Sequence, residues 1–135
     1  MIPSDEELAA AAEAAGDRAY SPYSGVRVGA ALLAADGRVF SGCNVENASF
    51  GLTLCAERTA LVKAISEGAR EFQAIAVWSS PERPLMPCGA CRQMLHEFAP
   101  ELRVIVAGRN GERQVLGLAE LLPRAIGFGD VAPSG

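Results

Sequence analysis

The chain has 135 residues, half of them hydrophobic, and a chain of this size can bury one continuous core, so we expect a single domain over residues 1–135. Its formal net charge of −4 comes from scattered residues with no block of Lys or Arg, which argues against nucleic acid as a partner. No apolar run approaches the length of about 20 residues that spans a bilayer, which argues against a membrane protein.

The first half of the chain predicts one helix and a pair of antiparallel strands. The opening residues are acidic, whereas a signal peptide is basic and then apolar, so we expect a cytoplasmic protein with reduced cysteines. Ser4 is a predicted N-cap with Glu7 three residues later, and an alanine-rich helix follows. Residues 26–45 contain two β-rich runs around Asp36-Gly37, a dipeptide typical of a tight hairpin turn.

The second half alternates helical and strand patterns, which predicts a layered α/β sheet. Periodicity and turn residues predict a helix over 55–69, a buried strand over 72–79, a helix over 88–99, a strand over 102–108, a short strand over 113–117 and a last helical turn over 118–122.

Three cysteines fall at the predicted starts of two helices. Cys55 begins the helix over 55–69, and Cys88 and Cys91, in "PCGACRQ", bracket the start of the next helix. A helix N-terminus favours thiolate, the form that binds zinc, and a C-x-x-C pair supplies two ligands in many zinc sites. With Cys55 as the third ligand, one position of a tetrahedral zinc remains for water, which is typical of a catalytic site.

Glu57 lies two residues after Cys55, in the first turn of the same helix. Zinc lowers the pKa of a bound water from about 16 toward about 7, and a neighbouring carboxylate can take that proton and return it elsewhere. The segments "C-A-E" and "P-C-x-x-C" match the all-cysteine form of a signature found in zinc nucleobase deaminases. His96, the sole histidine, is expected to be an ordinary helix residue, and Cys43 a small buried hydrophobe rather than a fourth ligand.

Residues 19–60, "PCGACRQ" and "ELLP" make the chain similar to the small, homotetrameric, zinc-dependent cytidine deaminases, from about Glu7 to Asp130. The resemblance implies a three-layer fold in which helices flank a mixed five-stranded sheet, and one zinc per subunit. It implies hydrolysis of cytidine or deoxycytidine to uridine or deoxyuridine and ammonia, with Glu57 as the proton shuttle. It also implies active sites shared between subunits.

The same resemblance assigns contacts around the metal and the substrate. The backbone of Ala56 would contact the pyrimidine carbonyl, and Asn44 and Glu46 would bind the ribose hydroxyls. Arg58 would donate hydrogen bonds to the thiolate sulfurs, which offsets the net negative charge of zinc with three thiolates.

Several positions near the pocket depart from the family pattern or concern a neighbouring subunit. Val26 stands where the family has Phe, and Ile126 and Phe128 replace a family Phe and Pro. The family's aromatic residues pack against the nucleoside, and such stacking contributes about 1 to 3 kcal/mol. Unless Phe128 or Trp78 substitutes, we expect a raised KM for cytidine, or a preference for a modified cytosine nucleoside or one of the blasticidin type. Ala48 and Phe50 are expected to approach the substrate of a neighbouring subunit.

Two other classes of protein stay open on the residues alone. A structural zinc module would use Cys43 as a fourth ligand and would leave Glu57 without a role. A thiol oxidoreductase would cycle Cys88 and Cys91 as a redox pair and would leave Cys55 unexplained.

Overall fold

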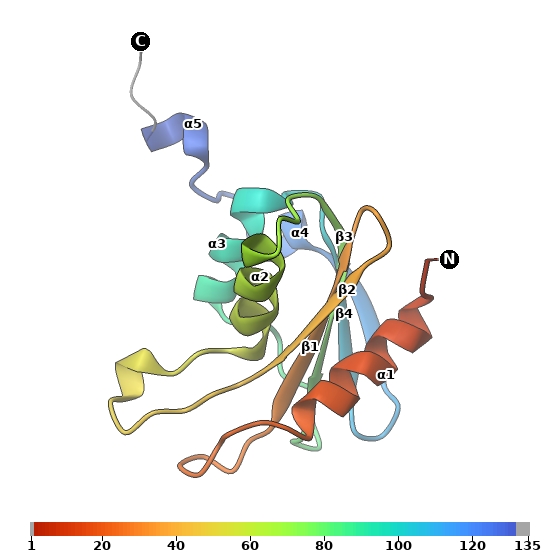
Figure 1. Cartoon of the computed structure of the whole chain (residues 1–135), viewed down its shortest axis with the longest axis vertical. Helices are drawn as coiled ribbons and strands as arrows, with labels where there is room; N and C mark the ends of the chain where they lie inside the picture. The colour runs from red at the N-terminus through yellow and green to blue at the C-terminus, as the bar shows by residue number, and fades with distance from the viewer. Residues whose placement is uncertain (1, 132–135) are drawn as a thin grey trace.

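A five-stranded mixed sheet runs through the centre of the molecule in the computed structural model, which describes residues 2–131 (Figure 1). Its strands are β1 (Val28–Ala34), β2 (Val39–Cys43), β3 (Phe72–Ser79), β4 (Arg103–Gly108) and β5 (Arg113–Gly117), in the order β2-β1-β3-β4-β5. Strands β3 and β4 are parallel, and α3 (Gly89–Phe98) provides the crossover connection that a parallel pair requires. The other neighbouring pairs are antiparallel. The predicted mixed five-stranded sheet is confirmed.

Helices cover both faces of this sheet, with α1 (Asp5–Gly16) on one face and α2 (Ala56–Ser66) and α3 on the other (Figure 1). Successive residues of β1 alternate between the two faces, as strand geometry requires. Leu33 packs in the apolar cluster under α1, and Leu32 packs in the cluster under α2 and α3. The molecule therefore has the three layers that the resemblance implied.

The predicted cap and hairpin turn are both present. The Ser4 hydroxyl accepts a hydrogen bond from the Glu7 N–H at 3.1 Å, and the Glu7 carboxylate accepts one from the Ser4 N–H at 3.0 Å. Gly37, in the turn between β1 and β2, has φ +95°, a conformation that glycine adopts without steric cost. Local sequence signals thus determine where these elements begin and turn.

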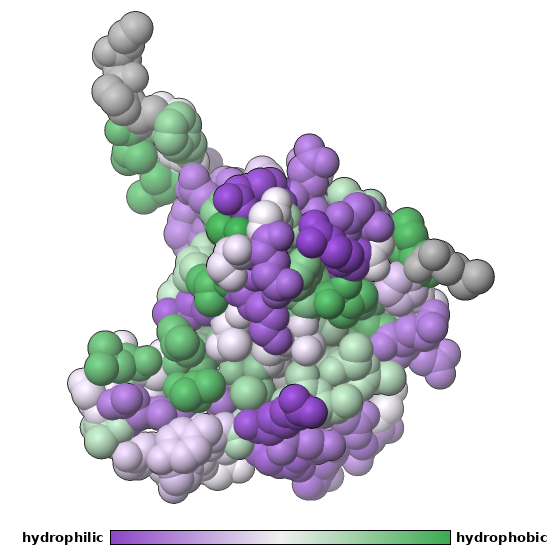
Figure 2. Space-filling model, in the orientation of Figure 1, coloured by the Kyte–Doolittle hydropathy of each residue, from purple (hydrophilic) through white to green (hydrophobic). Residues whose placement is uncertain are grey.

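Two segments project from this layered body. The connection between β2 and α2 carries the short 3₁₀ helix η1 (Phe50–Leu52), and the chain after α4 (Leu118–Leu121) leads to α5 (Phe128–Val131). Figure 1 places η1 and α5 far apart on the molecule, and Figure 2 shows apolar surface over both. Among residues 2–131, no helix is long and apolar enough to cross a membrane.

Candidate metal centre and substrate pocket

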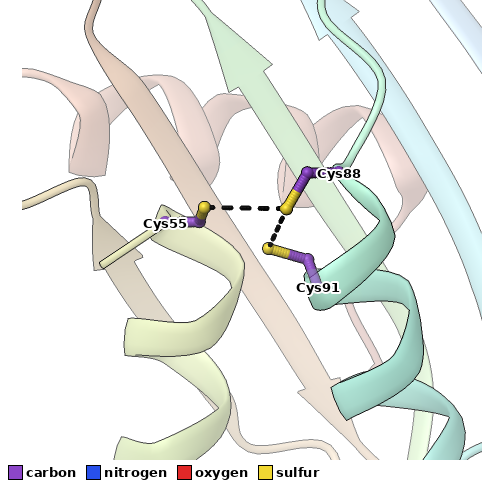
Figure 3. A group of neighbouring side chains, drawn as sticks. All are labelled: Cys55, Cys88 and Cys91. Atoms are coloured by element: carbon purple, nitrogen blue, oxygen red, sulfur yellow. Dashed lines mark hydrogen bonds between the residues drawn. The ribbon is translucent and has the colours of Figure 1, made fainter. Parts of the chain in front are cut away.

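Three cysteine side chains from α2 and α3 converge on one point (Figure 3). Cys55 is the N-cap residue of α2, Cys88 is the N-cap residue of α3, and Cys91 lies in the first turn of α3. The Sγ atoms of Cys55 and Cys88 are 3.8 Å apart, and those of Cys88 and Cys91 are 3.3 Å apart. All three sulfurs lie within 4.8 Å of one another, so the fold brings together the three residues that the sequence singled out.

The donor atoms and their spacing fit zinc. Tetrahedral zinc with bonds of about 2.3 Å to sulfur sets its thiolates about 3.8 Å apart, close to the spacing found here. Neither N-cap side chain accepts a hydrogen bond from the backbone N–H groups of its own helix, so the sulfurs of Cys55 and Cys88 remain directed at the shared point. The N-termini of two helices also meet there, and their partial positive charges favour thiolates.

The ionisation of the cluster also suits a cation. The hydrogen bond with Cys91, followed by the interactions with Arg58, lowers the pKa of Cys55 to about 5. The hydrogen bond with Cys55 and burial raise the pKa of Cys91, because only one of the adjacent sulfurs readily carries the negative charge. A bound divalent cation would allow all three sulfurs to be thiolates, since metal binding displaces the thiol protons.

Cys43 lies outside the cluster, in the edge strand β2, and donates its thiol hydrogen to the Arg18 carbonyl at 3.4 Å. The expectation that Cys43 is buried is wrong: its side chain is partly exposed because β2 is an edge strand of the sheet. His96 lies in the last turn of α3 and is likewise outside the cluster. Within residues 2–131, the group able to hold a metal thus comprises three cysteines, and a fourth thiol from Cys43 does not join it.

Glu57 is buried in the first turn of α2, with 4% of its surface exposed. Burial is the main cause that raises the pKa of its carboxyl group, and the negative charge of Cys55 acts in the same direction. A carboxyl group with a raised pKa can both accept and return a proton near neutral pH. Its environment therefore suits the proton transfer that the sequence suggested.

Arg58 connects the sulfur cluster to the loop before α2. Its Nη2 atom donates to Sγ of Cys55 and to the carbonyl of Thr53, both at 3.3 Å. The hydrogen bond to Cys55 is the largest cause that raises the pKa of Arg58, so the guanidinium remains charged beside the thiolate. This is the sulfur contact expected from the sequence.

A cavity of about 410 Å³ lies beside this loop and is lined by Tyr23, Ser24, Glu46, Phe50 and Thr53. The carboxylate of Glu46 accepts hydrogen bonds from the N–H groups of Tyr23 and Ser24, at 2.9 and 3.1 Å, and from the Ser24 hydroxyl. The hydrogen bonds from Ser24 lower the pKa of Glu46, so it is an anion near neutral pH. A carboxylate has about four acceptor sites, so Glu46 can accept further hydrogen bonds from hydroxyl groups.

Asn44 has a structural role that the sequence did not reveal. Its Oδ1 accepts a hydrogen bond from the Val28 N–H at 2.9 Å, and its Nδ2 donates to the Val26 carbonyl at 2.8 Å. These bonds fix the start of β1 against the end of β2. One amide hydrogen and one oxygen lone pair of Asn44 remain for other partners.

Sequence reasoning did not identify Tyr23 and Ser24 as residues of the site, although both contact Glu46. The sequence signal near them is "SPYSG", a Pro- and Gly-containing turn between the first helix and the first strand. A turn signal indicates a loop but not which distant carboxylate it binds.

The remaining predicted pocket residues are spread over the molecule. Ala56 is buried at the first position of α2, Val26 is half-buried before β1, and Ala48 is exposed between β2 and η1. The exposed ring of Phe50 meets the ring of Tyr23 edge-on, with centroids 5.7 Å apart. Ile126 and Phe128 are exposed near and in α5, and α5 lies far from η1, which carries the cavity residue Phe50 (Figure 1).

Trp78 does not replace the missing aromatic residue. Its ring packs in the cluster under α1, so closely that a Cβ added at Gly16 would lie 2.8 Å from it. Helices α2 and α3, which carry the cysteines, cover the other face of the sheet. The possibility that Trp78 stacks on a base is therefore wrong for this fold.

Comparison with known proteins agrees with this geometry. The family described as "Cytidine and deoxycytidylate deaminase zinc-binding region" matches residues 2–108. A cytidine deaminase from Sporosarcina psychrophila is 45% identical over 128 residues, covering 94% of each chain, and one from Halalkalibacterium halodurans is 55% identical over 108 residues, covering 79% of this chain and 82% of the relative.

Solved structures give the same result. The crystal structure of cytidine deaminase from Burkholderia pseudomallei superposes with a TM-score of 0.89 at 50% identity, covering 92% of this chain and 100% of that one. The family match spans most of the chain, and the relatives named here exceed 40% identity. The chain therefore belongs to the family of cytidine and deoxycytidylate deaminases that share this zinc-binding region.

Proposed function

We propose that this protein catalyses the zinc-dependent hydrolytic deamination of cytidine and deoxycytidine to uridine and deoxyuridine, with release of ammonia. The observation that carries the proposal is the convergence of the Cys55, Cys88 and Cys91 sulfurs beside the buried carboxyl group of Glu57. The cytidine deaminases at 45% identity over 94% of the chain support the same reaction and the same substrate class.

Cys55, Cys88 and Cys91 would hold zinc, which would supply the Lewis acidity that makes water a nucleophile near neutral pH. Glu57 takes one proton from this water and delivers it to N3 of the cytosine ring, where it stays in the product. Glu57 then passes the second water proton to the amino group at C4, which leaves as ammonia. A bond from oxygen to C4 forms and the bond from C4 to the amino nitrogen breaks, so the atoms balance.

Backbone and side-chain groups around the metal would orient the nucleoside. Ala56 is the first residue of α2, so its N–H has no partner within the helix and can donate to the pyrimidine carbonyl. Glu46 and the remaining hydrogen-bonding capacity of Asn44 would bind the ribose hydroxyls. Arg58 would offset the negative charge of the sulfurs through its contact with Cys55.

The assembly that we infer is a homotetramer of single-domain subunits, with one zinc in each and active sites shared between them. The separation of α5 from η1 (Figure 1) supports this inference, because a neighbouring copy would then bring Ile126 and Phe128 to the pocket. Ala48 and Phe50, exposed around η1, would reach the substrate of a neighbour in the same way. The scattered charge of the chain argues against nucleic acid as a partner, and the acidic residues near Met1 favour a cytoplasmic enzyme.

A modified cytosine nucleoside or one of the blasticidin type is the second candidate substrate. Aliphatic side chains at Val26 and Ile126 favour it, because they stack less well on an unmodified base than the family's aromatic residues do.

A panel of nucleosides tests the proposal. Purified protein loaded with zinc is incubated with cytidine, deoxycytidine, base-modified cytosine nucleosides and a blasticidin-type nucleoside, and ammonia release is measured with and without a strong chelator. We expect chelator-sensitive turnover of cytidine and deoxycytidine. Absence of ammonia release from every cytosine nucleoside, with zinc bound, would contradict the proposal.

A further inference from the structure

Two adjacent side chains on α3 bind the end of α4 and the segment that leads from α4 to α5. Arg92 donates from Nη1 to the carbonyl of Leu121 at 2.8 Å, and Gln93 donates from Nε2 to the carbonyl of Ile126, also at 2.8 Å. Both residues follow Cys91 directly along the helix. The helix that carries two of the three sulfurs therefore also holds the segment that carries Ile126.

The Gln93 contact is important because this segment has few other attachments. Over residues 123–127, the structure records no backbone hydrogen bond to any of the five strands or to helices α1 to α4. The N–H of Gly127 is bound by the side chain of Asp130, which lies within α5 itself. Gln93 thus fixes the position of Ile126 relative to the body of the molecule.

Arg92 extends the connection to the metal site. Its Nε atom donates to the carbonyl of Pro87 at 2.7 Å, and Pro87 directly precedes Cys88. A guanidinium is planar and presents its donors in a fixed fork, so one side chain holds the carbonyls of Pro87 and Leu121 in a defined relation. Arg92 thus couples the turn that carries Cys88 to the end of α4, from which the C-terminal segment starts.

We propose that Arg92 and Gln93 are positioning residues that hold the segment bearing Ile126 and Phe128 at a fixed orientation to the zinc-binding helix, and that Gln93 thereby sets the KM for the nucleoside. This inference rests on the proposed function, in which Ile126 and Phe128 contact the substrate of a neighbouring subunit. Neither side chain touches the reacting atoms, so the expected effect is on KM rather than on kcat.

The test compares Gln93→Met, which keeps the length of the side chain without its donor, with Gln93→Lys, which keeps a donor. Trypsin provides a readout independent of activity, because the exposed Arg124 lies inside the segment. We expect Gln93→Met to speed cleavage after Arg124 and to raise KM, each about fivefold, with kcat and zinc content unchanged. Gln93→Lys should restore both values toward those of the original protein.

Glu97→Gln serves as the matched control, since this exposed residue lies one turn further along α3 and we expect no change in either readout. Gln93→Asn, whose amide is too short to reach Ile126, should behave as Gln93→Met does and replaces it if that variant does not fold. Unchanged cleavage and unchanged KM in the donor-deficient variant would overturn the role of Gln93. If the original protein deaminates no nucleoside but the donor-deficient variant is cleaved faster, the result would support the contact between Gln93 and the segment and refute the proposed function.

Arg92→Lys tests the coupling to the metal site, because lysine keeps the charge and loses the fork. We expect faster cleavage after Arg124 and faster release of zinc to a chromogenic chelator. An unchanged rate in either measurement would overturn the coupling that we assign to Arg92.

Discussion

Glu46 accepts hydrogen bonds from two backbone N–H groups and a hydroxyl of the loop at Tyr23 and Ser24, and it also lines the cavity between that loop and the loop before α2. A carboxylate held in place by a neighbouring loop can receive a sugar hydroxyl without reorganisation, which lowers the free-energy cost of binding. The same residue thus shapes this cavity and, under the proposed function, would receive the ribose hydroxyls.

Replacement of Glu46 by alanine should raise the KM for cytidine about tenfold or more, because a hydrogen bond to a charged group contributes about 1.5 to 3 kcal/mol. Steady-state kinetics with cytidine and with a nucleoside lacking ribose hydroxyls provide the check, together with the melting temperature. We expect the variant to discriminate poorly between the two substrates. A KM ratio equal to that of the original protein would show that Glu46 does not bind the sugar.

At the scale of elements, α1 packs almost directly on β1. A Cβ added at Gly29 would lie 1.8 Å from the carbonyl oxygen of Ala12, so nothing larger than glycine fits between the helix and the strand. This close approach brings the α1 layer down onto the sheet and leaves the opposite face to α2 and α3.

Gly29→Ala should therefore reduce the free energy of unfolding by about 3 kcal/mol, the upper part of the range for overpacked sites. Denaturant unfolding measures the change. Gly129→Ala is the matched control, because a Cβ there meets nothing within 4 Å, and it should change the free energy of unfolding by less than about 0.5 kcal/mol. Equal stability of the two variants would contradict the close packing of α1.

Elements with local signals were predictable from the sequence. Residues only a few positions apart determine the Ser4 cap, the turn at Gly37 and the starts of α2 and α3. The C-x-x-C spacing is local as well. The orientation of Trp78 was not predictable, because β3 is apolar on both faces and its sequence does not reveal which face lies under α1. The bonds from Glu46 to residues 22 and 23 positions away depend on the tertiary fold.

At the scale of the whole molecule, apolar side chains are exposed at two separate places, around η1 and around α5 (Figure 2). Exposed apolar surface of this kind is typical of a contact between subunits. Two such places, far apart on one chain, suit an assembly in which each subunit meets more than one neighbour.

Leu52→Asp tests this assembly, because Leu52 is largely exposed in η1 and does not line the Glu46 cavity. Size-exclusion chromatography with light scattering should give the mass of four chains for the original protein and a smaller mass, with loss of activity, for the variant. Ile2→Asp, which alters an exposed apolar residue near the N-terminus, should remain tetrameric. An active monomer would refute the shared active sites.

The substrate preference also belongs to this scale, since Val26 and Ile126 would meet only across subunits. Val26→Phe combined with Ile126→Phe should lower the KM for cytidine about tenfold, through stacking on the base. Kinetics with cytidine measure the change, and Val26→Phe alone should give a smaller one. An unchanged KM in the double variant would show that these positions do not face the base.

The most direct measurement is the activity of Glu57→Gln at full zinc occupancy. This substitution leaves the cysteines in place and removes the group that accepts and returns protons. We predict one zinc per chain by elemental analysis and a kcat for cytidine reduced by a factor of about 10² to 10⁴. A zinc-loaded variant that deaminates cytidine at the original rate would contradict the assignment of proton transfer to Glu57.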